Sequence, residues 1–209
     1  MSTDLKKHWD SAYSNNEVTK LGWYEESPEP SLQLIQECDI PKDARILNVG
    51  VGASTLIDEI LKLGYTNVIA SDISSAALGK LQTRLGSKKN EIQWIEDDLT
   101  NPSKLSKIEA IDLWHDRAVL HFFTEEKDQN AYFSLLKKLV KLNGFVLIST
   151  FNTDGALKCS GLDVHRYNKE MLVDKLGEDF KLVEHFNYTY TMPSGDTRPY
   201  IYTFFKKIN

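Results

Sequence analysis

Short apolar runs alternate with amphipathic segments along most of this chain. Residues 45–49 form an apolar run typical of a strand buried on both faces, and residues 54–63 then carry apolar side chains at helical spacing. The same alternation recurs to about residue 176. It predicts strands over 45–49, 67–71, 92–95, 111–114 and 145–149, and helices over 54–63, 74–85, 131–140 and 168–176.

The pattern changes near the C-terminus, where two strands follow one another without a helix. Residues 182–191 and 200–205 are β-rich, and the turn residues Pro193, Gly195 and Asp196 lie between them. Alternating strands and helices predict an α/β fold with a parallel sheet covered by helices on both faces. The terminal hairpin adds two strands, which makes seven, and forces one of them to run antiparallel.

The first 40 residues differ from this repeating pattern. Pro28 and Pro30 break the chain, and Ser31 is a candidate N-cap for a short helix that ends near residues 39–41. We therefore predict an N-terminal extension over 1–40 and a single domain over 41–209. Two aromatic pairs lie in the extension: Trp9 with Tyr13, and Trp23 with Tyr24.

Composition narrows the functional classes. The 209 residues are 41% hydrophobic, with a net charge of −5 and a pI of about 5.6. This acidic balance argues against a nucleic-acid binder, and no apolar stretch approaches the length of a membrane span. Cys38 and Cys159 lie far apart and form no CxxC pair, which is typical of reduced thiols in a cytoplasmic protein. We expect a monomer or a weak dimer.

A glycine turn follows the first predicted strand. In parallel sheets, ligands bind beyond the carboxyl ends of the strands, so Gly50 and Gly52 are candidates to lie against a ligand. Asp72 ends the second strand, where an acid can accept hydrogen bonds from ribose hydroxyls. A tight turn and a helix cap remain the alternatives. A nicotinamide dinucleotide is disfavoured because Thr55 stands at the third glycine position of its GxGxxG fingerprint.

Several segments together resemble the class I S-adenosylmethionine-dependent methyltransferases. They are ILNVGVG, the acid in ASDIS, the acidic pair in WIEDDLT, the segment IDLWHDRAV and the C-terminal hairpin. The resemblance covers about residue 45 to the C-terminus. It implies a Rossmann-like three-layer α/β sandwich, with a mostly parallel seven-stranded sheet and S-adenosyl-L-methionine as the cofactor.

The resemblance also implies roles for individual residues. Asp72 would bind the ribose hydroxyls, and Asp98 would accept from the adenine amino group, with adjacent Asp97 as the competing candidate. The first strand of the family usually carries an acid where this chain has Asn48, which leaves the strength of cofactor binding open. The other implied cofactor contacts are Gly50, Val51 and Gly52 at the turn, Ile73 on the adenine face and the Leu99 backbone N–H.

The end of the fourth strand is the expected place for the methyl acceptor. His115, Asp116, Arg117 and His121 fall within seven residues there. We expect Asp116 to face the methyl group and to contact the cofactor. Arg117 is a candidate to pair with Asp116 or with an anionic substrate, and His121 shares a face with Arg117 if a helix begins there. Packing within the core is the alternative for both histidines.

Two groups of methyltransferases share features with this chain. Residues 114–117, Trp-His-Asp-Arg, resemble the small-molecule and thiopurine S-methyltransferases, and they are similar to the Asp-Lys-Gly segment of some protein-lysine methyltransferases, with Ala118 in place of glycine. The N-terminal segment resembles both groups and would close over the cofactor with Trp9, Tyr13, Trp23 and Tyr24. Alternatively, these aromatic side chains only pack the extension against the core.

These features predict a methyltransferase acting on a small-molecule acceptor. The alternatives are a protein-lysine methyltransferase and a catalytically silent module that binds S-adenosylmethionine. The long polar loop over 152–168 would shape the acceptor pocket, with Cys159, His165 and Arg166 as candidate contacts. A metal site at Cys159 and His165 lacks further ligands, so we expect no bound metal.

Overall fold

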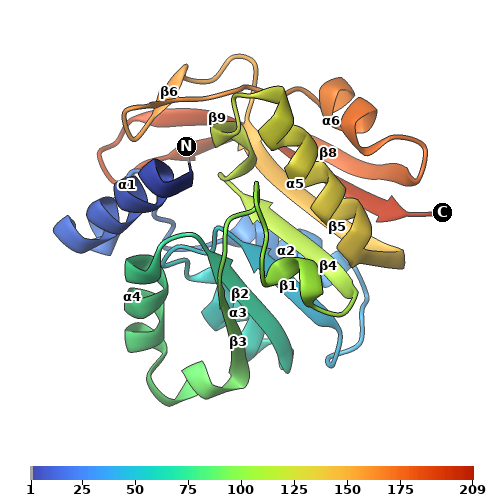
Figure 1. Cartoon of the computed structure of the whole chain (residues 1–209), viewed down its shortest axis with the longest axis horizontal. Helices are drawn as coiled ribbons and strands as arrows, with labels where there is room; N and C mark the ends of the chain where they lie inside the picture. Colours follow the sequence, from blue (N-terminus) through green and yellow to red (C-terminus); the bar gives the residue numbers. More distant parts are fainter. Residues whose placement is uncertain (1) are drawn as a thin grey trace.

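A computed structural model describes residues 2–209, and the side chains from Asp4 onward. One seven-stranded sheet runs through the molecule in the order β3-β2-β1-β4-β5-β9-β8 (Figure 1). Strands β1 to β5 pair in parallel, and β9 runs antiparallel to both of its neighbours, β5 and β8. The strands are β1 Arg45–Val49, β2 Asn67–Asp72, β3 Ile92–Glu96, β4 Ile111–Arg117, β5 Val140–Phe151, β8 Phe180–Thr191 and β9 Thr197–Lys207.

Helices cover both faces of this sheet and give three layers (Figure 1). Trp114 and Ile148 project from one face into the core beneath α5 and α6, whereas Ile46 and Leu113 project from the other into the core beneath α2, α3 and α4. This alternation within β4 follows from the two-residue period of a strand. The helices are α1 Ser2–Asn15, α2 Glu29–Glu37, α3 Leu56–Lys62, α4 Ser75–Leu85, α5 Glu126–Leu139 and α6 Lys169–Leu176.

The predicted fold class is confirmed, while several element bounds differ. Helix α5 begins five residues before the predicted position, because Glu126 and Asp128 form a polar first turn that precedes its apolar face. Strand β5 is also longer at both ends than the apolar run suggested, and its pairing with β4 has a register shift between Ile111 and Leu113. The loop over 152–168 contains a small two-stranded ribbon, β6 Lys158–Cys159 with β7 Leu162–Asp163.

The N-terminal extension contains more helix than the sequence indicated. Helix α1 lies beside α4 at one end of the sheet (Figure 1). Ser31 is not the N-cap of α2, because that helix begins at Glu29 with Pro28 before it. Four short 3-10 helices connect the elements: Val18–Lys20, Gly86–Glu91, Leu105–Lys107 and Leu120–Phe122. Across residues 2–209, we find no helix with the length and apolar character needed to cross a membrane.

Candidate functional site

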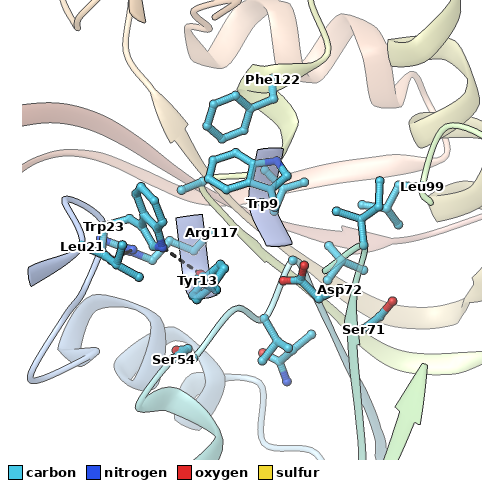
Figure 2. Close-up of a pocket in the computed structure, with 18 of the residues that line it drawn as sticks. Trp9, Tyr13, Leu21, Trp23, Ser54, Ser71, Asp72, Leu99, Arg117 and Phe122 are labelled. Atoms are coloured by element: carbon cyan, nitrogen blue, oxygen red, sulfur yellow. Dashed lines mark hydrogen bonds between the residues drawn. The ribbon is translucent and has the colours of Figure 1, made fainter. Parts of the chain in front are cut away.

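A cleft opens at the carboxyl ends of β1, β2 and β4, and Trp9 and Tyr13 of α1 line it (Figure 2). The space between its walls, counted together with the open mouth, is about 1270 Å³. Four carboxylates, those of Glu25, Asp72, Asp97 and Asp98, line the cleft together with the guanidinium of Arg117. This excess of acidic groups makes the cleft suited to a cationic ligand.

The glycine turn forms the floor of the cleft. Gly50 and Gly52 have φ angles of +56° and +54°, a region that favours glycine. A Cβ on Gly50 would lie 1.9 Å from a Val119 methyl, and a Cβ on Gly52 would lie 2.2 Å from the Tyr13 hydroxyl. The sequence suggested that a ligand requires these glycines. The structure shows that close approach of two of the protein's own side chains requires them as well.

Asp72 lies at the end of β2 and faces the cleft, and it is only 7% exposed. One carboxylate oxygen accepts the Gly52 N–H at 2.8 Å, and the other accepts the Ser74 N–H at 2.8 Å. Burial raises the pKa of this carboxyl to about 6, although the backbone hydrogen bonds oppose the shift. The cap of α4 is Ser74, which accepts from the Ala77 N–H, so each oxygen of Asp72 retains a lone pair for a ligand.

The two adjacent acids after β3 have different surroundings. Asp97 accepts backbone N–H groups from Ser103, Lys104 and Leu105, and these bonds lower the pKa of its carboxyl despite partial burial. Asp98 uses one oxygen for Thr100, while its buried Oδ2 has no hydrogen-bond partner among the described residues. A buried acceptor without a partner is costly unless a ligand satisfies it. Asp98 is therefore the better placed of the two acids to bind a ligand donor.

Asn48 also faces the cleft from β1, and it is 2% exposed. Its side-chain nitrogen is buried without a partner within the described chain. Val51, Ile73 and Leu99, which the sequence analysis also placed near the cofactor, line the same cleft. Apart from Asp116 and Gly52, the expected cofactor residues thus line one cleft; Gly52 lies in the turn behind the Tyr13 hydroxyl and does not line it.

Aromatic side chains from the N-terminal extension form the opposite wall. Trp9 packs edge-on against both Trp23 and Phe122, with ring centroids 5.3 and 4.9 Å apart (Figure 2). The Trp23 indole N–H donates to the Tyr13 hydroxyl at 2.8 Å. Tyr24 lines the cleft beside them. Aromatic faces attract cations, so this wall suits a positively charged ligand.

Polar contacts fix α1 in this position. The Asp10 carboxylate accepts the Ser74 hydroxyl at 2.7 Å and the Ala76 N–H at 3.2 Å, at the start of α4. Lys6 lies 2.8 Å from Glu96 at the end of β3. His8 lies 3.1 Å from the Ser160 hydroxyl, in the loop after β5. The extension is therefore tied to several elements that surround the cleft.

Arg117 pairs with an acid that the sequence analysis did not identify. Its guanidinium lies 2.8 Å from the Glu25 carboxylate and donates to the Trp23 carbonyl at 3.0 Å. The rings of Tyr190 and Tyr200 lie 4.9 and 5.3 Å from the guanidinium carbon. Burial raises the pKa of Glu25, although Arg117 opposes this shift. Of the two partners expected for Arg117, Asp116 is not its partner in the structure, and an anionic substrate stays a prediction.

Asp116 does not reach the cleft. It projects from the opposite face of β4, where its carboxylate accepts the Val119 N–H at 3.0 Å, the Leu120 N–H at 3.2 Å and the Tyr132 hydroxyl at 2.7 Å. It is fully buried, and burial raises its pKa to about 7. The expectation that Asp116 faces the methyl group and contacts the cofactor is wrong in this geometry, because strand alternation directs Arg117, not Asp116, into the cleft.

The two histidines near this strand have packing roles. His115 borders the cleft, and its Nε2 lies 3.0 Å from the Ser31 hydroxyl of α2. His121 lies outside the cleft lining, with its Nδ1 3.3 Å from the Thr150 hydroxyl and its ring stacked on Phe151. Burial, with a smaller contribution from Arg117, lowers the pKa of each to about 3, so both are neutral. The structure does not bring His121 to the expected catalytic position.

The loop after β5 contributes one residue to the cleft. Cys159 lines it, and burial raises the pKa of its thiol to about 11. Arg166 instead donates to the Thr153 and Gly155 carbonyls, and the His165 ring packs against Tyr167.

The sequence analysis did not identify two residues of the cleft, Glu25 and Phe122, because neither belongs to a recognisable motif. The EESPEP segment carried the only signal, an acid placed directly after the aromatic pair.

Comparisons with known proteins agree with this architecture. Residues 46–144 match a family described as a methyltransferase domain. The chain is 26% identical over 199 residues to human EEF1A lysine methyltransferase 2, an alignment that covers 86% of this chain and 75% of that protein. It is 27% identical over 199 residues to the mouse protein of the same name, covering 86% of this chain and 72% of that protein.

Solved structures show the same fold. A SAM-dependent methyltransferase from Anabaena variabilis superposes with a TM-score of 0.77 at 15% identity, covering 99% of this chain and 94% of that one. The N-methyltransferase NodS from Bradyrhizobium japonicum, in complex with S-adenosyl-L-homocysteine, gives a TM-score of 0.69 at 14% identity, with 98% of each chain covered. Residues 46–144 thus match a methyltransferase domain, and the whole chain has the fold of S-adenosylmethionine-dependent methyltransferases; with the cleft geometry, these matches support an S-adenosylmethionine-dependent methyltransferase.

Proposed function

We propose that this methyltransferase transfers a methyl group to a lysine side chain of a protein, with elongation factor 1A as the first candidate. The observation that carries the proposal is the alignment with EEF1A lysine methyltransferase 2, which spans 86% of this chain and 75% of the human protein. The acidic, aromatic-walled cleft supports it, because a lysine brings a cation on a long apolar stem.

The residues in the cleft fit S-adenosylmethionine. Asp72 offers two oxygens to the ribose hydroxyls, and the unpartnered Oδ2 of Asp98 offers an acceptor to the adenine amino group. The buried Asn48 amide provides a donor near the amino acid end of the cofactor. Gly50 and Val51 would back the cofactor at the turn, with Ile73 and Leu99 beside the adenine. When bound, the cofactor supplies a methyl group on a positively charged sulfur.

The protein would mainly position the acceptor amine and exclude water. Trp9, Trp23 and Phe122 form an aromatic wall that favours an ammonium group and keeps water from the reacting atoms. Glu25, which Arg117 holds in place, would hydrogen-bond the ammonium before it loses a proton. Only the neutral amine has the lone pair that attacks a methyl carbon, so the ammonium would first release its proton to water at the open mouth of the cleft. The new carbon–nitrogen bond would then replace the carbon–sulfur bond, with S-adenosylhomocysteine as the leaving group. We assign Asp116 a positioning role, through the 119–120 turn.

The small-molecule acceptor expected from the sequence stays a prediction. NodS is 14% identical to this chain, and a didemethyltoxoflavin N1-methyltransferase from Burkholderia thailandensis is 17% identical, so both indicate the fold and do not bear on the acceptor. The protein acceptor is preferred because its support comes from sequence identity over most of the chain. A cytoplasmic location also stays a prediction and is compatible with a translation factor as substrate.

One labelling experiment separates these functions. The purified chain is incubated with methyl-labelled S-adenosylmethionine and, in parallel, with recombinant elongation factor 1A or a pool of small metabolites. We expect label on a lysine of the protein, located by peptide mass spectrometry. Label found solely in the metabolite fraction would overturn the lysine proposal and support the prediction of a small-molecule acceptor. Calorimetric binding of the cofactor without any transfer would favour a silent binding module.

A further inference from the structure

A second groove lies beside the cleft, at the same edge of the sheet. Its walls are Thr19 and residues 24–27 of the N-terminal extension, and residues 188–193 at the end of β8 and just after it. Tyr24 and Glu25 line both this groove and the cleft. A polypeptide lying in the groove could therefore extend one side chain past these two residues toward the methyl donor.

The chemistry of the groove fits a basic polypeptide. The exposed Glu26 provides negative charge on one wall, while Glu25, whose carboxylate pairs with Arg117, lies at the junction with the cleft. Tyr188, Tyr190 and Met192 give the opposite wall apolar surface for the stems of lysine and its neighbours. The arrangement thus offers negative charge for a basic segment and apolar surface for the rest of it.

The two walls are joined, so the groove has a defined shape. The Tyr190 hydroxyl donates to the Tyr24 carbonyl, and Tyr190 also stacks on the Arg117 guanidinium that pairs with Glu25. Strand β8 ends the sheet order, so its outer edge has no neighbouring strand among residues 2–209. An extended peptide can use such an edge for backbone hydrogen bonds.

We propose that this groove binds the extended, basic segment of the substrate protein that flanks the target lysine. The inference rests on the proposed lysine methyltransferase function and adds how the protein substrate is recognised. The groove would hold the chain on either side of the lysine, while the cleft receives the lysine itself.

Charge reversal at the groove tests the proposal. The first variant is Glu26→Lys, and the second is Thr189→Lys, which adds a positive charge at another exposed lining position. The matched control is Glu178→Lys, an exposed acid just before β8, at the opposite end of that strand from the groove. Glu26→Lys and Glu178→Lys change the net charge equally, so they separate a groove effect from a general effect of an acidic protein.

Binding is measured by fluorescence anisotropy with a labelled lysine-containing basic dodecapeptide and S-adenosylhomocysteine present. We expect both groove variants to weaken peptide binding about tenfold, with the control within about twofold of the parent. In methylation assays with elongation factor 1A, the groove variants should raise KM with little change in kcat. Calorimetric affinity for S-adenosylhomocysteine should not change in any variant.

The outcomes distinguish the two proposals. If the parent protein does not bind the peptide, or if the control weakens binding as much as the groove variants, the groove proposal is overturned. Peptide binding that depends on Glu26, without any methyl transfer, would support the groove proposal and overturn the proposed lysine methyltransferase function. Methylation of elongation factor 1A with an unchanged KM in both groove variants would overturn the groove proposal and support the proposed function.

Discussion

Cofactor affinity should depend on pH through Asp72. This carboxyl is buried, and its pKa is raised to about 6 in the ligand-free protein. Hydrogen bonds from ribose hydroxyls favour the charged carboxylate, so binding should strengthen as the pH rises through 6. At pH 5 about one-tenth of the Asp72 carboxyls are ionised. If the ionised form binds, the affinity for S-adenosylhomocysteine should be about tenfold weaker at pH 5 than at pH 7.5.

The raised pKa of Asp72 also makes folding stability depend on pH, but folding stability falls as the pH rises, whereas cofactor affinity increases. The folded, ligand-free protein retains a proton on Asp72 between about pH 4 and pH 6, whereas the unfolded chain has released it. Folding stability therefore falls as the pH rises through this window, by up to about 3 kcal/mol from this group. Asp116 is shifted in the same direction, so the Asp72 contribution is read as the difference between the parent and a variant.

The assay is titration calorimetry with S-adenosylhomocysteine from pH 5 to pH 7.5, on the parent and on Asp72→Asn. The variant should bind about 10- to 150-fold more weakly at pH 7.5, since charge-assisted hydrogen bonds contribute about 1.5–3 kcal/mol. It should also lose the pH dependence. Because an amide has one acceptor oxygen for the Gly52 and Ser74 N–H groups, its Tm is measured in parallel. A flat parent profile, or a slope that persists in the variant, would refute the reasoning.

Three further substitutions test the site. Gly50→Ala should lower stability by about 1–3 kcal/mol in chemical denaturation and weaken cofactor binding, because the new Cβ would meet Val119 at 1.9 Å. Asp98→Asn should weaken S-adenosylhomocysteine binding about tenfold in calorimetry while the Tm changes little, since one of its oxygens has no protein partner. Asp116→Asn should lower the free energy of unfolding by about 1–3 kcal/mol and leave cofactor affinity within about threefold, because Tyr132 and two backbone N–H groups bind its carboxylate outside the cleft.

Matched controls exist for these changes. Gly79→Ala lies within α4 with no atom within 4 Å of the new Cβ, so it should raise stability by up to about 1 kcal/mol, whereas Gly50→Ala should lower it. Asp97→Asn removes a carboxylate that binds the N–H groups of the 103–105 turn, so it should lower the Tm more than Asp98→Asn does. Equal Tm losses in these two variants would contradict the different roles assigned to them.

The sequence predicted the alternation of strands and helices because the buried positions of each element recur along the sequence with a regular period. A parallel strand buried on both faces appears in the sequence as an apolar run. A helix packed on the sheet appears as apolar residues spaced three and four positions apart. These rules located β1, β2, β4 and the terminal hairpin, and the carboxyl-end rule then placed Gly50 and Asp72 at one site. The predicted start of α5 was wrong, because a polar first turn precedes the apolar face of that helix.

The direction of side chains at the end of β4 was decided by tertiary structure. Asp116 and Arg117 are adjacent, and no sequence rule says which of them faces the cleft. The register of β4 against β1 and β5 sends Arg117 into the cleft and Asp116 toward α5. Likewise, the choice between Asp97 and Asp98 depends on the 103–105 turn, which takes the hydrogen-bonding capacity of Asp97.

The sequence by itself determined the fold class, the glycine turn and the acid that ends β2, because each follows from backbone periodicity and local conformation. Only the tertiary structure decided which residues meet across the cleft. Glu25 and Arg117 are separated by 91 intervening residues, and Trp9 reaches Phe122 across more than half of the chain. Such contacts depend on how the N-terminal extension packs onto the sheet, and packing between distant segments leaves no periodic signal in either segment alone.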